Sequence, residues 1–295
     1  MIRVPPILLF ALLALNTSVL LAQDNPRVTI IADAFSERDD VRLDWGFAAL
    51  VEYRGKRILF DAGNDAELLA ENARALGIDL TRLDFVVVSH RHGDHANGLR
   101  HVLSINPDVP IYAPAGDEYF GTTTSPAYFE RTRPELPASM RYFGGNVPAT
   151  VTRSGPWPTQ FRRVTGRVEL APGIALVANR DPDGAYRETP ELSLVLDTPA
   201  GQVVVVGCSH PGIERILASV DAKTTPVAGI IGGLHLVTTP EAEVDRLVDA
   251  LRNEWNVKAL AAGHCSGEYA FAVMRRVYGE RYHYAGVGAT VEFAP

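Results

Sequence analysis

Sulfur and positive charge are both scarce in this chain. Its 295 residues include two cysteines and three methionines, and the formal net charge at pH 7 is −7. Two cysteines allow at most one disulfide, so the sequence excludes a small scaffold held together by several disulfides. The acidic balance, without a cluster of lysine and arginine interleaved with aromatic residues, is unlike a nucleic-acid-binding surface. We therefore expect a small-molecule substrate and no nucleic acid among the partners.

No apolar run long enough to cross a bilayer occurs after residue 22. A membrane-spanning helix needs about 20 consecutive apolar residues, so we expect no stable span in residues 23–295. The first 22 residues differ, because Arg3 supplies positive charge, residues 7–15 form an apolar run and Ala22 is a small residue suited to cleavage. They predict a signal peptide and a secreted or periplasmic protein. The alternative, a retained membrane anchor, fits poorly with an apolar run this short.

Hydrophobic patterning predicts a single α/β domain over residues 23–295. Apolar runs bounded by turn residues predict strands at residues 27–32, 47–53, 57–60, 85–88, 192–196, 203–206, 229–235 and 259–264. Apolar residues three or four apart predict helices near residues 68–76 and 244–251. Regular patterning fades between about residues 115 and 189. We interpret this stretch as an irregular insertion that forms a lid or substrate-binding loops.

The segment Ser89-His90-Arg91-His92-Gly93-Asp94-His95 carries the strongest chemical signal. It follows a predicted buried strand, and open α/β sheets usually bind ligands just beyond such strand ends. His90 and His92 are two apart in extended chain, so their imidazoles point the same way and can bind one metal ion. Asp94 and His95 come at the expected start of a helix and can bind a second ion. Imidazole nitrogens with one carboxylate are typical of zinc, with iron or manganese as alternatives.

Three further histidines follow predicted strands and are candidates for the remaining ligands: His210, His235 and His264. The only two cysteines are next to this chemistry, in Gly207-Cys208-Ser209-His210 and Gly263-His264-Cys265. In an oxidising compartment these cysteines can form one disulfide, or they can belong to the metal site. His101 and His283 lack this context, and we expect them to be structural.

Several motifs resemble those of the metallo-β-lactamase superfamily. The segment from Ser89 to His95 resembles its metal-binding motif, and Phe60-Asp61-Ala62-Gly63 resembles its preceding aspartate motif. A narrower resemblance is to a branch that includes the archaeal dihydropterin ribofuranosylaminobenzene phosphate synthases and many hydrolases. It rests on Asp44-Trp45-Gly46-Phe47, Leu59-Phe60-Asp61-Ala62-Gly63, Gly207-Cys208-Ser209-His210-Pro211-Gly212-Ile213, Gly232-Gly233-Leu234-His235-Leu236 and Gly263-His264-Cys265-Ser266-Gly267. The resemblance implies an αβ/βα four-layer sandwich with the metal ions at one edge of the sheets.

The resemblance also implies a set of ligands. By it, the first metal ion is held by His90, His92 and one further histidine, and the second by Asp94, His95 and His264. Asp61 would lie outside the metal site and orient one of these ligands.

The chain departs from the family pattern at Cys208, which stands where most members have a bridging aspartate. Either Cys208 binds metal as a thiolate or the bridge is missing. We take His210 as the third ligand of the first metal, and Glu191 as the less favoured alternative.

The resulting prediction is a metal-dependent hydrolase. Two divalent ions would activate a hydroxide that attacks an ester, lactone, amide or phosphoester of a small molecule. Asp94 and His235 are the catalytic candidates, Asp94 to orient the hydroxide and His235 to protonate the leaving group. A serine hydrolase is disfavoured because no Gly-x-Ser-x-Gly turn occurs.

Three alternatives stay open. One is a synthase-type transferase that acts on a phosphoribosyl donor, against which export argues because such substrates are intracellular. The others are a metal-binding protein without turnover and an iron redox enzyme.

Overall fold

The computed structural model describes residues 25–116, 121–122, 132–147, 153–154, 161–183 and 189–293, with only the backbone described at 121–122 and 153–154. The predicted signal peptide, residues 1–22, lies outside the described residues. Among the helices in the described ranges, none is long and apolar enough to cross a membrane.

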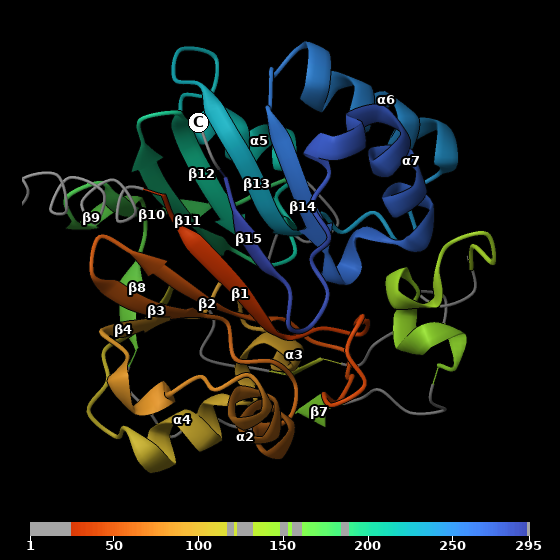
Figure 1. Ribbon diagram of the computed structural model, residues 1–295. Helices are drawn as coiled ribbons and strands as arrows, with labels where there is room; N and C mark the ends of the chain where they lie inside the picture. Colours follow the sequence, from red (N-terminus) through yellow and green to blue (C-terminus); the bar gives the residue numbers. More distant parts are fainter. Residues whose placement is uncertain are drawn as a thin grey trace, which may run out of the picture.

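Two mixed β-sheets pack face to face, and helices cover the outer face of each (Figure 1). The seven-stranded sheet has the order β15 (Thr290–Glu292), β1 (Arg27–Ala32), β2 (Ala48–Tyr53), β3 (Lys56–Phe60), β4 (Phe85–Val87), β5 (Ile111–Pro114) and β8 (Arg162–Val164). The six-stranded sheet has the order β14 (Ala259–Gly263), β13 (Val227–Gly233), β12 (Gly201–Val206), β11 (Glu191–Thr198), β10 (Ile174–Asn179) and β9 (Arg167–Ala171).

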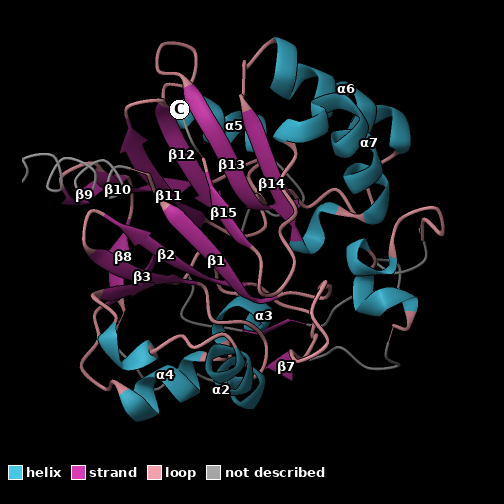
Figure 2. Cartoon of the chain, viewed as in Figure 1, coloured by secondary structure: helices cyan, strands magenta, loops and turns pink. Residues whose placement is uncertain are grey.

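The helices divide between the two outer faces (Figure 2). The first sheet is covered by α2 (Ala66–Ala75), α3 (Gly93–Ala96) and α4 (Leu99–Ile105), and the second by α5 (Ile213–Ser219), α6 (Glu241–Asn253) and α7 (Glu268–Tyr278). One apolar core fills the space between the two sheets. A second core lies between the first sheet and its helices, and a third lies between the second sheet and its helices. This is the αβ/βα four-layer sandwich that the family resemblance implies.

Local sequence explains the helices that frame the layers. Asp65 caps α2 by accepting hydrogen bonds from the N–H groups of Glu67 and Leu68, and the helix buries Leu68 and Leu69 against the first sheet. Helix α6 buries Val244, Leu247, Val248 and Leu251, which are three or four apart. The central strands read as continuous apolar runs because both of their faces are buried.

The predicted irregular insertion at about residues 115–189 differs from the structure in its last third. Residues 162–179 supply β8, β9 and β10, which belong to the two main sheets. β8 and β9 lie at the edges of the two sheets and have exposed arginines. Edge strands bury fewer apolar side chains, so the hydrophobic pattern did not predict them. Earlier in the stretch, β6 (Gly121–Thr122) and β7 (Arg153–Ser154) form a small hairpin-like pair that lies beside α3.

The direction of the strands places the candidate site residues at one edge of the two sheets. Strands β1, β3 and β4 run in the same direction, and so do β12, β13 and β14 in the other sheet. The segments that follow these strands contain Asp33, Asp61, His90, Cys208, His235 and His264. Because both sheets end at the same edge, residues far apart in the sequence meet there.

Candidate metal centre

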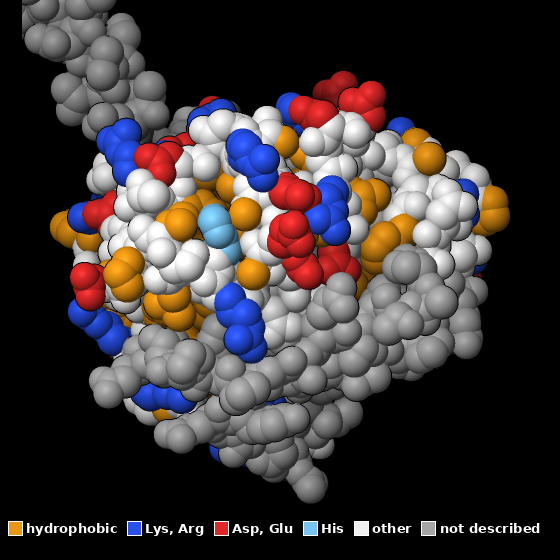
Figure 3. Space-filling view, turned by 90° about the horizontal axis from the view of Figure 1, so that it is seen from below, with side chains coloured by type: hydrophobic (Ala, Val, Ile, Leu, Met, Phe, Trp, Pro, Cys, Tyr) orange, Lys and Arg blue, Asp and Glu red, His pale blue; other side chains and the backbone are white. Residues whose placement is uncertain are grey.

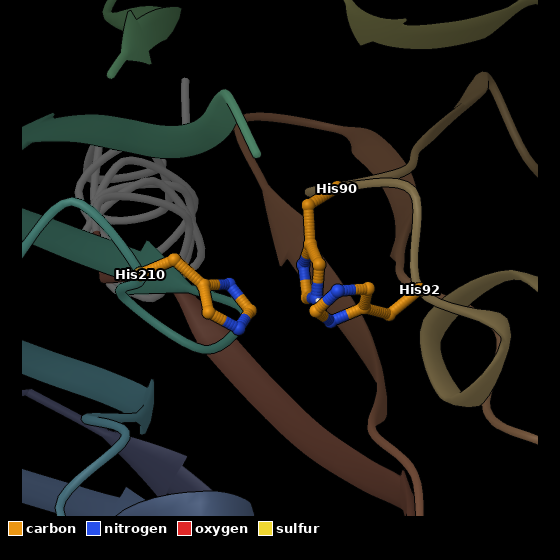
Figure 4. A group of neighbouring side chains, drawn as sticks. All are labelled: His90, His92 and His210. Atoms are coloured by element: carbon orange, nitrogen blue, oxygen red, sulfur yellow. Dashed lines mark hydrogen bonds between the residues drawn. The ribbon is translucent and has the colours of Figure 1, made fainter. Parts of the chain in front are cut away.

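The first group of possible ligands joins two loops from different sheets. His90 and His92 follow β4, and His210 follows β12, and the three imidazoles face one another (Figure 4). His90 Nε2 lies 3.1 Å from His92 Nδ1, and the ring centroid of His210 lies 4.6 Å from that of His90 and 4.8 Å from that of His92. One nitrogen from each ring lies within 4.8 Å of the others. The structure thus brings together the three residues predicted for the first metal.

The second group lies beside the first. His95 Nε2 is 3.0 Å from His264 Nε2, and Asp94 Oδ2 is 3.6 Å from each of these two nitrogens. Asp94 and His95 are in the short helix α3, whereas His264 follows β14 at the far side of the second sheet. This arrangement is the one predicted for the second metal.

Cys208 lies between the two groups. Its Sγ is 3.2 Å from His95 Nε2. This sulfur, one ring nitrogen of His90 and one of His95 all lie within 4.8 Å of one another. The Cys208 thiol therefore lies close to one histidine of each group. Both cysteines are free thiols, so the alternative of a disulfide between Cys208 and Cys265 is not realised.

Asp61 orients two of the histidines. Its Oδ2 lies 2.7 Å from His95 Nδ1 and also accepts a hydrogen bond from Ser89 Oγ at 2.7 Å, while Oδ1 accepts one from Ser89 N at 2.6 Å. Ser89 Oγ in turn lies 2.8 Å from His90 Nδ1. A carboxylate that accepts a hydrogen bond from Nδ1–H leaves Nε2 of the same ring as the electron-pair donor. Gly207 makes room for this network, because a Cβ there would lie 2.1 Å from Ser89 Oγ.

Glu191 holds the loop that carries His210. Its two oxygens accept hydrogen bonds from the N–H groups of Gly207, Cys208, Ser209 and His210, at 2.7–3.2 Å, and Oε2 also lies 3.1 Å from His210 Nδ1. Burial alone would raise the pKa of Glu191, but the hydrogen bonds from His210 and the backbone lower it below its ordinary value. Glu191 is therefore placed to orient His210, and the alternative of Glu191 as the third ligand does not fit this geometry.

Three supporting residues have no assigned role in the sequence-based prediction. Asp33 accepts a hydrogen bond from His264 N at 2.9 Å, and Tyr142 donates one from its hydroxyl to His264 O at 2.5 Å. The Trp45 side chain hydrogen-bonds Asp94, and its ring packs 4.9 Å from that of His264. Asp33 directly follows a buried strand, as Asp61 does, so the same signal was available for it. Tyr142 lies within the stretch that has no regular pattern.

The other predicted residues are also located. The ring of His235, which follows β13, lies 4.5 Å from that of His210. His101 is in α4, and His283 packs against Phe293 at 5.6 Å between ring centroids. Neither takes part in the clusters of possible ligands found among the described residues.

The electrostatics suit cation binding. Burial, reinforced by the neighbouring imidazoles, lowers the pKa of His90, His92 and His95 well below the ordinary value, and that of His264 to about 3. These rings are therefore neutral near pH 7 and have free electron pairs. Burial raises the pKa of Asp94 to about 7, a shift that a nearby cation would reverse.

The donor set fits divalent ions by its spacing as well. With zinc–nitrogen distances of about 2.0–2.1 Å, two nitrogens of a tetrahedral site are about 3.3 Å apart, close to the separations of 3.0 and 3.1 Å found here. Asp94 Oδ1 is buried and has no hydrogen-bond partner among the described residues. A buried carboxylate oxygen in this state is costly unless it binds a proton or a cation.

Comparison with known proteins agrees with this geometry. A family model described as the metallo-beta-lactamase superfamily matches residues 41–246. A 7,8-dihydropterin-6-methyl-4-(beta-D-ribofuranosyl)-aminobenzene-5'-phosphate synthase of Methanocaldococcus jannaschii is 27% identical over 281 residues, which covers 84% of this chain and 88% of the relative. The resemblance to that branch is confirmed.

Two solved structures share the fold. Tm1679, described as a metal-dependent hydrolase of the beta-lactamase superfamily, has a TM-score of 0.68 and 24% identity, covering 92% of this chain and 100% of its own. The metallo-beta-lactamase fold protein YhfI from Bacillus subtilis has a TM-score of 0.53 and 13% identity, covering 91% and 100%. Since the family model spans most of the chain, and the motifs at the strand ends lie together in space, the chain belongs to the metallo-β-lactamase superfamily.

Proposed function

We propose that this protein is a metal-dependent hydrolase that cleaves an ester, lactone, amide or phosphoester of a small molecule. The observation that carries the proposal is the pair of adjacent ligand groups, His90, His92 and His210 on one side and Asp94, His95 and His264 on the other. We further propose that each group would hold one divalent ion, of zinc, iron or manganese, and that Cys208 would bind metal there as a thiolate. Superfamily membership supports metal binding, and many members are hydrolases.

Divalent ions in these positions would supply a water of lowered pKa and positive charge that stabilises the developing oxyanion. Side chains of the protein would orient the attacking water, hold the metal ligands in place and transfer a proton. Asp94 Oδ1 can accept a hydrogen bond from the attacking water and orient it, because this oxygen has no hydrogen-bond partner among the described residues. Asp61 and Glu191 keep the imidazoles of His95 and His210 in a fixed orientation. We assign His235 to transfer a proton to the leaving group.

A cavity next to this centre supports a small-molecule substrate. It has a volume of about 490 Å³, and His210, His235, Pro211 and Leu236 are among the residues that line it. This size is within the range of small-ligand sites. On the face seen in Figure 3, the described basic and acidic side chains are interspersed, which does not favour a polyanionic partner.

The first test is metal dependence. We expect the purified protein to contain about two divalent ions per chain and to lose hydrolysis when they are removed by a chelator. Elemental analysis measures the ions, and a panel of esters, lactones, amides and phosphodiesters measures the activity before and after chelation. Re-addition of zinc, manganese or ferrous iron should restore the activity. A chelated, metal-free protein that hydrolyses the same substrate at an unchanged rate would refute the proposal.

The proton-transfer role of His235 makes a separate prediction. His235→Asn should lower kcat/KM about 10²-fold for a substrate with a poor leaving group, because general acid catalysis contributes about 10²–10⁴-fold. A substrate with a good leaving group, such as a nitrophenyl ester or phosphodiester, should be little affected. Asparagine suits the site because the backbone there has φ +52°, a left-handed conformation that asparagine tolerates. Equal losses for both leaving groups would rule out this role, and His101→Asn serves as the control.

The relative from Methanocaldococcus jannaschii supports a second candidate, a synthase-type transferase that acts on a phosphoribosyl donor. The two candidates differ in what accepts the transferred group, water or an aromatic acid. Incubation with a phosphoribosyl donor, with and without an aromatic acid, separates them. A product that joins the two, with no hydrolysis of any compound in the panel, would favour the transferase.

We also propose that residues 1–22 direct export, so that the protein acts in the periplasm or outside the cell. The apolar run of residues 7–15 between Arg3 and Ala22 supports this. An extracytoplasmic location favours the hydrolase, because phosphoribosyl donors are intracellular. Sequencing of the N-terminus of the mature protein from its native host tests the proposal, and an intact residue 1 would contradict it.

A further inference from the structure

A second cluster of possible metal ligands lies next to the candidate metal centre and includes Cys265, which the proposed mechanism does not use. Cys208 Sγ, Cys265 Sγ and a ring nitrogen of His235 lie within 4.8 Å of one another. Both thiols are buried, and the Cys265 thiol is hydrogen-bonded to Cys208 and to His235. The three residues follow β12, β13 and β14, which are adjacent in the second sheet.

The backbone between the two cysteines is shaped so that their sulfurs can approach. Gly233 ends β13, the strand between β12 and β14, and a Cβ at this glycine would lie 2.7 Å from Cys265 Sγ. A Cβ would also lie 2.6 Å from Gly207 O, so glycine at this position leaves room for both the neighbouring backbone and the Cys265 thiol.

The segment that carries His235 is tied to Cys265 by its backbone. The N–H groups of Leu236 and Val237 donate hydrogen bonds to Cys265 O at 3.1 and 3.3 Å. His235 itself adopts a left-handed conformation with φ +52°, which is strained for a residue other than glycine. Such strain persists only where surrounding contacts impose it. The contacts with Cys265 are of this kind.

The chemistry of the cluster differs from that of the two neighbouring groups. Two thiolates and one imidazole are soft or borderline donors, which bind zinc, copper(I) and cadmium in preference to harder ions. A set of two cysteines and one histidine also leaves a fourth position open in a tetrahedral site. His235 is half-buried and lines the cavity described above, so this position has a route to solvent.

We propose that Cys208, His235 and Cys265 form a third cation site, which takes a thiophilic ion. Cys208 belongs to this site and also lies against His95 of the second group. An ion in the sulfur site therefore shares the Cys208 thiolate with the candidate metal centre. Formation of the site releases the thiol protons to solvent and needs no oxidant. An ion bound in the sulfur site would occupy a ring nitrogen of His235, so the proton transfer proposed above for His235 needs the state in which the sulfur site holds no ion.

Cadmium tests the proposal, because the ultraviolet sulfur-to-cadmium charge-transfer band grows with the number of bound thiolates. The full chain is first reduced with a phosphine, freed of other metals with a chelator and confirmed to have both thiols free. On saturation with Cd²⁺, we expect a band of two thiolates per chain in the wild type. Cys265→Ser should halve this band, and Cys208→Ser should do the same.

His235→Asn should keep both thiolates but weaken the sulfur site at least about tenfold, since even outer partners of ligands change metal affinity by about that much. His101→Asn, a substitution of a partly buried histidine outside the clusters, should change neither quantity. X-ray absorption of the cadmium-loaded wild type counts the sulfur neighbours without any substitution, in case a variant fails to fold. A band of one thiolate that Cys265→Ser leaves unchanged would overturn the proposal and make Cys265 a hydrogen-bond partner of Cys208 only.

Discussion

Asp94→Ala is expected to lower kcat/KM by about three orders of magnitude and to reduce the bound metal from about two ions per chain to about one. Asp94 supplies the only carboxylate oxygens in the two proposed ligand groups, and its Oδ2 lies 3.6 Å from the Nε2 atoms of both His95 and His264. Without this negative charge the second ion loses a ligand, and the attacking water loses the group that orients it. Elemental analysis and steady-state kinetics on the same preparation measure both effects.

The fold should survive this substitution. Burial raises the pKa of Asp94 from 3.8 to about 7, so the ionised side chain destabilises the metal-free protein. The protonated form contributes stability that is fully present below pH 3.8 and is lost as the pH rises to about 7. Metal-free wild type should therefore lose stability across this interval, whereas metal-free Asp94→Ala should lose less, as measured by urea denaturation.

Asp40→Ala provides the matched control, because Asp40 is an exposed aspartate that pairs with Arg38 on the surface. It should leave the metal content, the kinetics and the pH dependence of stability close to those of the wild type. Full activity and two bound ions in Asp94→Ala would show that Asp94 is not a ligand.

Glu191→Ala should destabilise the metal-free protein by about 3 kcal/mol or more, because each buried N–H group left without its acceptor costs about 1–3 kcal/mol. The carboxylate accepts hydrogen bonds from four consecutive backbone N–H groups, and all four would be left without this acceptor in the interior. Glu191 is fully buried, so water cannot readily replace it. Urea denaturation in the presence of a chelator measures the loss apart from any effect of metal binding.

The same substitution should weaken metal binding at the first group, because His210 would lose the carboxylate that orients its ring. Glu191→Gln should give a smaller loss of stability, since the amide keeps one acceptor oxygen. Glu169→Ala is the control, because Glu169 is exposed and, among the described residues, accepts a backbone hydrogen bond from Gly173 N alone. A change in Glu191→Ala of less than about 0.5 kcal/mol, the range of ordinary surface substitutions, would contradict the role of Glu191.

Much of the fold could be read from the sequence because the predicted strands are buried on both faces. The runs at 203–206 and 229–235 correspond to β12 and β13, and the apolar spacing of residues 244–251 matches the buried face of α6. The edge strands β8 and β9 were not predicted, because their exposed arginines break the apolar pattern. Buried strands need apolar residues and therefore leave a recognisable pattern in the sequence, whereas edge strands are partly exposed and leave a weaker one.

The candidate site could be read in part for a similar reason. His90, His92, Asp94 and His95 lie within six residues, so local chain geometry alone brings them together. His210 and His264 were recognisable because each follows a buried strand, and strands that run in the same direction end at the same edge of a sheet.

The sequence by itself thus determined the α/β class, the local cluster from His90 to His95 and the strand-end position of its partners, and the four-layer fold followed from the resemblance of its motifs to the metallo-β-lactamase superfamily. Only the tertiary structure decided which groups face one another. The antiparallel pairing of β11 with β12 sets Glu191 under the loop of residues 207–210, which makes it a support for His210. The parallel order of β12, β13 and β14 sets Cys208 opposite Cys265 across Gly233. Such contacts depend on strand register and on the packing of the two sheets, and neither leaves a local pattern in the sequence.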